Sequence, residues 1–233
     1  MRLPAWWTPT PTPTTFAPMP ALKTVLFDLD GTLIDSIQLI IDSYHHTLEV
    51  HGLPARTDKE WLDGIGTPLR VQFADWAHDD AQMEAMIATY RDYNIFHHDS
   101  RVTVYPGVLE MVRAVRAAGC RTGLVTSKNR VGAFRGLRLA GLEEAMDVVI
   151  GADDVENPKP HREPVDRAVA HLGADPSSTV YVGDSIHDMH SGRSAGVRTA
   201  AVLWGPFGRE DLEPSKPDFW LERPADLLSH LTT

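Results

Sequence analysis

The chain has 233 residues, a formal net charge of −10, and hydrophobic and charged fractions of 42% and 23%, as in ordinary soluble globular proteins. Its acidic balance argues against a general nucleic-acid-binding protein, because affinity for the phosphate backbone depends on lysine and arginine. The single cysteine, Cys120, excludes an intrachain disulfide framework and a zinc site built from several cysteines. A reducing, cytoplasmic location is therefore expected.

The first twenty residues are rich in proline and threonine. Proline at every second position of the stretch TPTPTPT disfavours a helix, so we predict a disordered, extended tail over residues 1–20. This segment contains neither the continuous apolar stretch of a signal peptide nor a run long enough to span a membrane. We expect no membrane partner.

A short apolar run, TVLFDLD, follows the tail and ends in a glycine turn, which predicts a buried strand. The next part of the chain, from Ser36 to about Ser100, shows helical spacing without a convincing strand. Its four segments are SIQLIIDSYHHTLEVHG, TDKEWLDGIG, TPLRVQFADWAH and DAQMEAMIATYRDYNIFHHD. We therefore predict a block of helices directly after the first strand.

Beyond this block, predicted helices and strands alternate. The helices are VLEMVRAVRAAG, NRVGAFRGLRLAGL, HREPVDRAVAHLG and IHDMHSGRSAG, and the strands are RTGLVTS, MDVVIG, STVYVGD and TAAVLW. Such alternation indicates right-handed βαβ units and a parallel sheet covered by helices on both faces. The predicted fold class is α/β, with a Rossmann-like core over residues 21–35 and 104–233. An α-helical cap domain is inserted at 36–103, and hinges are expected near Asp35 and Tyr105.

Polar residues follow four of the predicted strands at the points where the strands end. They are Asp28, Asp30, Thr126, Ser127, Lys128, Asp153, Asp154, Lys159, Asp184 and Asp188. Because ligands bind at the carboxyl ends of the strands in an open parallel sheet, these side chains are expected to converge. Carboxylates in this number need a counter-cation, and their oxygens suit Mg²⁺. The hydroxyl and ammonium groups suit a phosphoryl group.

Each of these residues also has a simpler explanation when it is taken alone. The stretch Asp28–Gly31 is typical of an Asx-type turn after a strand. Asp184 and Asp188 are equally typical of a helix N-cap and first turn, and Lys159 of a solvent-exposed lysine. The combination at four strand ends, in this order, favours a functional site over a set of unrelated structural residues.

The chain resembles the haloacid dehalogenase-like (HAD) hydrolase superfamily with a helical cap after the first strand, over about 22–231. The resemblance depends on FDLDGTLIDS, on Thr126, on Lys159-Pro160 and on GDSIHD. Within the superfamily, the stretches GIGTPL, VTSKN and AGVRTAAVLWG are most similar to the phosphoglycolate phosphatase group and its pyrophosphatase relatives.

This resemblance implies a role for each matching residue. Asp28 would be the nucleophile that forms an aspartyl-phosphate intermediate, and Asp30 would be the acid and base that carries the proton. Thr126 and Lys159 would bind the transferring phosphoryl oxygens. The implied Mg²⁺ ligands are Asp28, the backbone carbonyl of Asp30, Asp184 and, directly or through water, Asp188.

The candidate substrate-binding residues are Gly31, Thr32, Ser127 and Arg70. Gly31 would allow the turn after the first strand, and Thr32 would help to hold the active loop. Arg70 stands in the cap, where recognition of the leaving group is expected, and its guanidinium would suit a small carboxylate or a second phosphate. A solvated position on a helix surface is a slightly more typical place for this arginine.

The resemblance thus predicts a Mg²⁺-dependent phosphatase that acts on a small phosphorylated metabolite similar to phosphoglycolate. Asp30, Asp184 and Asp188 favour a phosphatase over a dehalogenase, which usually lacks a carboxylate at the position of Asp30. An inorganic pyrophosphatase or a sugar phosphomutase are alternatives on the same scaffold. The non-enzymatic alternative is a phospho-acceptor domain similar to response-regulator receivers, which carry no inserted cap.

Overall fold

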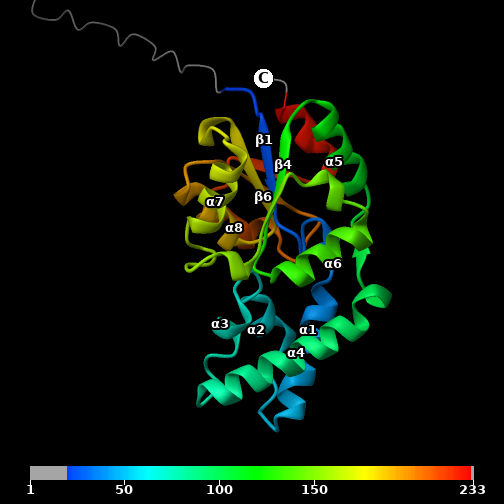
Figure 1. The fold of residues 1–233 in the computed structure, drawn as a ribbon, viewed down its shortest axis with the longest axis vertical. Helices are drawn as coiled ribbons and strands as arrows, with labels where there is room; N and C mark the ends of the chain where they lie inside the picture. Colours follow the sequence, from blue (N-terminus) through cyan, green and yellow to red (C-terminus); the bar gives the residue numbers. More distant parts are fainter. Residues whose placement is uncertain (1–19, 232–233) are drawn as a thin grey trace, which may run out of the picture.

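The computed structural model describes residues 20–231 (Figure 1). The predicted proline- and threonine-rich tail therefore lies, except for Pro20, outside the described residues. Among residues 20–231, no helix combines the length and the apolar character needed to cross a membrane.

Six parallel strands form the central sheet in the order β5-β4-β1-β6-β7-β8. They are β1 (Thr24–Phe27), β4 (Arg121–Val125), β5 (Val148–Ile150), β6 (Thr179–Gly183), β7 (Arg198–Val202) and β8 (Phe219–Leu221). The chain adds β4 and β5 on one side of β1 and then returns to add β6 on the other side. This reversal opens a crevice at the carboxyl ends of β1, β4 and β6, which is where a ligand site is expected.

Helices cover both faces of the sheet, as the sequence predicts. They are α5 (Val108–Ala117), α6 (Arg130–Ala140), α7 (Glu163–Leu172), α8 (Ile186–Ser194) and the short α9 (Arg209–Leu212). Alternate side chains of β1 point to opposite faces, so Val25 and Phe27 join a different hydrophobic cluster from Leu26. The first cluster includes residues of α5 and α6 and the second includes residues of α7, in agreement with their positions on either side of β1 in Figure 1. The predicted α/β class is confirmed.

Along the chain, four helices are inserted between β1 and the remaining strands of the core. In space they lie below the sheet in Figure 1. They are α1 (Ile37–Val50), α2 (Asp58–Leu62), α3 (Leu69–Gln72) and α4 (Asp80–Arg101). They share a hydrophobic cluster of their own, which includes Tyr44, Trp61, Phe73 and Tyr90. Helices α2 and α3 are shorter than the segments that the sequence suggested. Gly66, with φ +97°, interrupts the backbone between them.

The two chain crossings between this helical insertion and the core are hydrogen-bonded to each other. The short strands β2 (Ile34–Asp35) and β3 (Thr103–Val104) pair in antiparallel fashion, with Ile34 opposite Val104 and Asp35 opposite Thr103. Sequence reasoning placed the crossings near Asp35 and Tyr105 but did not predict strands there. Two residues are too few to show the period-two alternation that identifies a strand.

Candidate active site

The first polar residues of the site stand in a tight loop directly after β1. The amide of Asp28 still donates to the carbonyl of Val182 at 2.9 Å, as in a strand, and the carbonyl of Leu29 then accepts the amides of the following turn. Gly31 has φ +83°, and a Cβ atom on it would lie 2.4 Å from Oδ2 of Asp184. Glycine is therefore required at this position, because any side chain would push the loop away from Asp184.

Three further contacts hold this loop against Asp184. The hydroxyl of Thr32 donates to Oδ1 of Asp184 at 3.1 Å, and the indole N–H of Trp204 donates to the carbonyl of Thr32 at 2.9 Å. Gly205 passes so close that a Cβ atom on it would lie 2.6 Å from the carbonyl oxygen of Gly31. Sequence reasoning included Trp204 in the predicted strand TAAVLW and gave it no role. In the structure β7 ends at Val202, and the position of a polar N–H just beyond a strand end was the available signal.

Three carboxylates come together beside this loop. Asp28, Asp184 and Asp188 are all buried, and one oxygen from each lies within 4.8 Å of the others. Burial raises the pKa of Asp28 to about 7, with the charge of Asp188 adding to the effect, although Lys159 opposes it. Burial and the charges of Asp188 and Asp28 likewise raise the pKa of Asp184. Like charges enclosed in this way favour a bound cation or a bound proton.

The chemistry of these groups fits Mg²⁺, which prefers oxygen ligands. Oδ2 of Asp184 is buried and has no hydrogen-bond partner in the part of the chain that the structure describes. An unpartnered buried carboxylate oxygen is costly, and a cation at this position would satisfy it. The donor set therefore agrees with the metal ligands Asp28, Asp184 and Asp188 that the resemblance implies.

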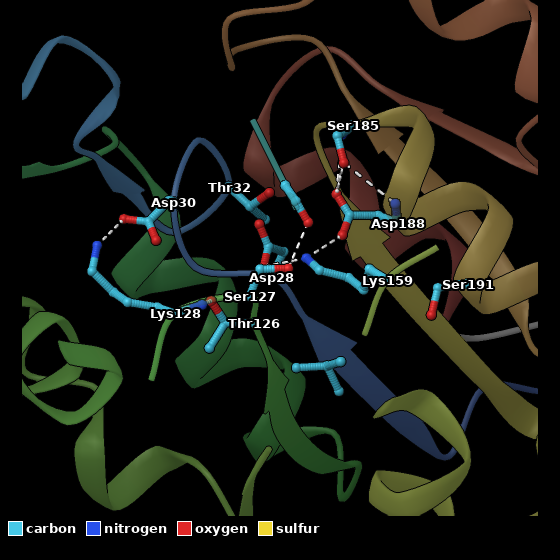
Figure 2. Close-up of polar contacts among 12 residues, drawn as sticks. Asp28, Asp30, Thr32, Thr126, Ser127, Lys128, Lys159, Ser185, Asp188 and Ser191 are labelled. Atoms are coloured by element: carbon cyan, nitrogen blue, oxygen red, sulfur yellow. Dashed lines mark hydrogen bonds and ion pairs between the residues drawn. The ribbon is translucent and has the colours of Figure 1, made fainter. Parts of the chain in front are cut away.

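Lys159 lies between two of these carboxylates (Figure 2). Its Nζ is 2.9 Å from Oδ1 of Asp28 and 2.7 Å from Oδ1 of Asp188. Burial alone would lower the pKa of Lys159, but the charges of Asp188 and Asp28 outweigh this and raise it. The other oxygen of Asp188 accepts from the amide and the hydroxyl of Ser185, at 3.0 and 2.6 Å. Lys159 and Asp188 thus form an ionised, fully hydrogen-bonded pair beneath Asp28.

Asp30 lies apart from the three carboxylates and pairs with Lys128 (Figure 2). Its Oδ1 accepts from Nζ of Lys128 at 2.6 Å and from the hydroxyl of Ser36 at 2.5 Å. Burial opposes ionisation, but these contacts lower the pKa of Asp30 below its ordinary value. The expectation that Asp30 carries a proton therefore differs from this arrangement, in which its carboxylate is ionised. Lys128 was recognised at the strand end but received no role.

Thr126 and Ser127 follow β4 and reach the same crevice. Oγ1 of Thr126 accepts from the amide of Lys128 at 3.1 Å and is held near the end of the strand. The hydroxyl of Ser127 donates to the carbonyl of Gly66 at 2.5 Å, which joins the core to the loop between α2 and α3. Ser127 thus contacts the helical insertion as well as the crevice.

A cavity of about 440 Å³ lies between the strand ends and the helical insertion. The predicted residues that line it are Asp28, Asp30, Thr126, Ser127, Lys159, Asp184 and Arg70. Gly31 and Thr32, predicted to bind substrate, are not among the lining residues and instead contact Asp184. Thr32 is fully buried, so the part of the loop formed by Gly31 and Thr32 faces the core and not the cavity.

Arg70 lines the cavity, but carboxylates of the insertion already neutralise its charge. Its guanidinium pairs with Glu84 and lies 3.6 Å from Asp80, while half of the side chain is exposed. Both carboxylates that pair with Arg70 belong to the helical insertion. The geometry therefore agrees better with a solvated arginine on a helix surface than with a guanidinium that is free to bind an anion.

Comparison with known proteins agrees with this arrangement. Residues 25–202 match the family described as haloacid dehalogenase-like hydrolase. The chain belongs to this family. The HAD hydrolase expected from the sequence is thus confirmed.

Relatives and solved HAD structures extend the likeness over most of the chain. Proteins named pyrophosphatase PpaX are 44% identical in Bacillus cereus and in Anoxybacillus flavithermus, covering 91% and 90% of this chain and 97% of each relative. A putative haloacid dehalogenase-like hydrolase from Bacteroides fragilis superposes with a TM-score of 0.82 at 27% identity, covering 88% of this chain and 99% of the other. A predicted phosphoglycolate phosphatase from Haemophilus somnus has a TM-score of 0.80 at 24% identity over 91% of this chain and 98% of its own; it shares the fold.

Proposed function

We propose that this HAD hydrolase is a Mg²⁺-dependent phosphatase that works through an aspartyl-phosphate on Asp28. One observation carries the proposal. The carboxylate of Asp28 lies at the floor of the cavity, 2.9 Å from a buried ammonium group and within a cluster of three carboxylates. A nucleophile, a cationic group and a cation-binding cluster at one point are the requirements of phosphoryl transfer.

In the proposed reaction, an oxygen of Asp28 forms a bond to phosphorus as the bond from phosphorus to the leaving oxygen breaks. Lys159 and Thr126 would stabilise the charge on the phosphoryl oxygens. The leaving oxygen needs a proton, and Asp30 would supply it. For this, the Asp30 carboxylate would first separate from Lys128 and take up a proton. A water oxygen then forms a bond to the phosphorus of the aspartyl-phosphate and gives a proton back to Asp30. The bond from phosphorus to the Asp28 oxygen breaks, which releases phosphate and restores the Asp28 carboxylate.

The metal would be held by Asp28, the backbone carbonyl of Asp30, Asp184 and, directly or through water, Asp188. It would supply positive charge that offsets the repulsion between an anionic phosphate and the carboxylates. The protein holds the binding groups in place by burying them: Thr32 fixes one oxygen of Asp184 and leaves the other free.

We further propose that residues 36–103 act as a cap that closes over the crevice and excludes water. The paired crossings at β2 and β3 provide a narrow connection for such a movement. Besides the β2–β3 pairing, the contacts between cap and core include the hydrogen bond from Ser36 to Asp30, the one from Ser127 to Gly66 and the bidentate ion pair of Arg135 with Asp99. A movement of the cap must therefore either break these contacts or follow a path that preserves all of them.

The names of the relatives make inorganic pyrophosphate the first substrate to test, and a phosphoglycolate-like monoester remains the second candidate. A small phosphorylated compound in the cytoplasm, with neither nucleic acid nor membrane as partner, is the corresponding physiological setting. The direct experiment measures phosphate release from pyrophosphate, 2-phosphoglycolate and sugar phosphates, with Mg²⁺ and with a chelator. Release of phosphate over many turnovers that requires Mg²⁺ supports the proposal. A stable phosphorylated chain without turnover would support the receiver-like alternative.

The stabilisation of the fold by Mg²⁺ is expected to increase with pH. The pKa of Asp28 is raised to about 7, and that of Asp184 is also raised. At about pH 5 the metal must displace protons from these carboxyls, whereas at about pH 8 it relieves the repulsion of ionised Asp28. Thermal unfolding with and without Mg²⁺ should therefore show a larger increase in Tm at the higher pH.

Asp184→Asn is the variant in which this pH-dependent difference should disappear, because it removes one of the three charges. Asp153→Asn changes an exposed strand-end aspartate outside the cavity and should keep the difference. An increase in Tm that is the same at both pH values would contradict metal binding by these buried carboxyls.

A further inference from the structure

Apolar side chains, most of them from the cap, line much of the cavity. Those of Ile40, Ile65, Leu69, Ile87 and Ile95 come from the cap, and that of Val131 comes from α6. Apolar walls favour an apolar occupant, since each square ångström of apolar surface removed from water contributes about 25 cal/mol. A phosphate bound at Asp28 would therefore place its leaving group against a largely hydrocarbon wall.

Two tyrosines belong to this wall, and other aromatic rings of the cap pack against them. Tyr44 and Tyr90 are only 3% and 7% exposed, and their ring centroids lie 4.9 Å apart. The ring of Tyr44 stacks on Trp61 at 4.3 Å with an interplanar angle of 9°, and both tyrosines make edge contacts with Phe73. Such packing fixes the direction of both rings before any ligand arrives.

The hydroxyls of these tyrosines are available to a ligand. Within residues 20–231, neither Tyr44 nor Tyr90 makes a hydrogen bond through its hydroxyl, although both side chains line the cavity. Burial and the charge of Asp30 raise the pKa of Tyr44, and burial raises that of Tyr90, so both hydroxyls stay protonated. They can therefore donate hydrogen bonds to an oxygen acceptor.

Most of the cations around this part of the cavity are already paired with carboxylates, which disfavours a second phosphate group. Arg70 is paired with Glu84, and Arg135 is paired with Asp99. Lys128 is occupied by Asp30. Arg91 also lines the cavity, and within residues 20–231 it makes no ion pair. Apart from its contact with Arg91, a polyanionic leaving group would have to compete for cations that are already paired and be desolvated against hydrocarbon, which is costly.

We propose that the leaving group is an organic alcohol or phenol with an apolar body against the isoleucine-rich wall and an oxygen acceptor for the hydroxyls of Tyr44 and Tyr90. The preferred substrate is thus a monoester with an apolar leaving group, in preference to pyrophosphate. This inference rests on the proposed phosphatase function, since it assumes that a phosphoryl group binds at Asp28. Tyr44 and Tyr90 are the residues that determine specificity in this site.

The inference is tested by equilibrium binding of compounds that cannot be hydrolysed, measured by calorimetry on the full chain with Mg²⁺. Phenylphosphonate should bind at least about tenfold more tightly than methylphosphonate and than imidodiphosphate, a pyrophosphate analogue. Equal binding of phenylphosphonate and methylphosphonate, or tighter binding of imidodiphosphate, would overturn the inference. Because binding needs no turnover, a failure of the proposed function would appear separately, as the absence of phosphate release from every compound.

Single substitutions then test the two hydroxyls. 3-Methoxyphenylphosphonate carries an added oxygen acceptor, and its advantage over phenylphosphonate should fall about three- to tenfold in Tyr44→Phe or Tyr90→Phe. Tyr93→Phe is the matched control, because Tyr93 lies on α4 like Tyr90 but does not line the cavity. An advantage that is unchanged in both variants, or reduced equally in Tyr93→Phe, would contradict a role for these hydroxyls.

Discussion

Asp28→Asn is expected to reduce phosphate release by at least about 10³-fold, because an amide is a poor nucleophile towards phosphorus. The same substitution should leave the metal-free fold intact or more stable at about pH 8. It removes a buried charge beside Asp184 and Asp188, and burial already raises the pKa of Asp28. Steady-state phosphate release and thermal unfolding of the same preparation measure the two effects.

The combination of these two results separates chemistry from folding. A loss of activity with unchanged or higher stability assigns Asp28 to the reaction itself. Asp153→Asn is the control, since Asp153 also follows a strand but is exposed and lies outside the cavity. Asp28→Asn retaining more than about a tenth of the activity would contradict the assignment of the nucleophile.

Lys159→Met is expected to cost about 3–5 kcal/mol of the free energy of unfolding at about pH 8 without metal. The ammonium group is almost fully buried and lies within 2.9 Å of Asp28 and 2.7 Å of Asp188, so its removal leaves two buried carboxylates without a counter-charge. Phosphate release should also fall by at least about 10²-fold, because charge stabilisation on the phosphoryl oxygens is lost.

The pH dependence identifies the cause of this destabilisation. At about pH 5 the raised pKa of Asp28 lets its carboxyl take up a proton, so the penalty in Lys159→Met should be smaller than at pH 8. Urea unfolding at both pH values measures the difference. Lys59→Met changes a lysine whose side chain is 82% exposed and should alter stability by less than about 0.5 kcal/mol. A penalty for Lys159→Met that does not change with pH would point to lost packing instead.

Much of the core could be predicted because its signals are local. The buried strand before Asp28 is a continuous apolar run that ends in a turn. The helical spacing after Gly107 reflects the period of 3.6 residues, which the sequence displays directly. Polar residues at strand ends converge because parallel strands end at one edge of a sheet. This rule predicts that Asp28, Lys159 and Asp184 lie close together, and all three line one cavity.

The remaining features depend on distant partners. Asp30 is ionised because Lys128 lies beside it, and no local pattern connects these two residues. Thr32 was predicted to bind substrate, but its hydroxyl donates to Asp184 and its carbonyl accepts from Trp204, which hold it in the core. The tyrosines of the cap face the cavity only because α1 and α4 pack as they do, and helical spacing alone does not show which face meets the core.

The pairing of β2 with β3 also affects how the sheet assembles from the unfolded chain. The central contact between β1 and β4 joins residues as far apart as Thr24 and Arg121, with the whole helical insertion between them. If the insertion folds first and brings Ile34 next to Val104, the remaining loop is several times shorter. By the logarithmic dependence of closure entropy on loop length, this lowers the cost of closing the sheet by about 1 kcal/mol. A segment that interrupts the core in the sequence would thereby speed the formation of its centre.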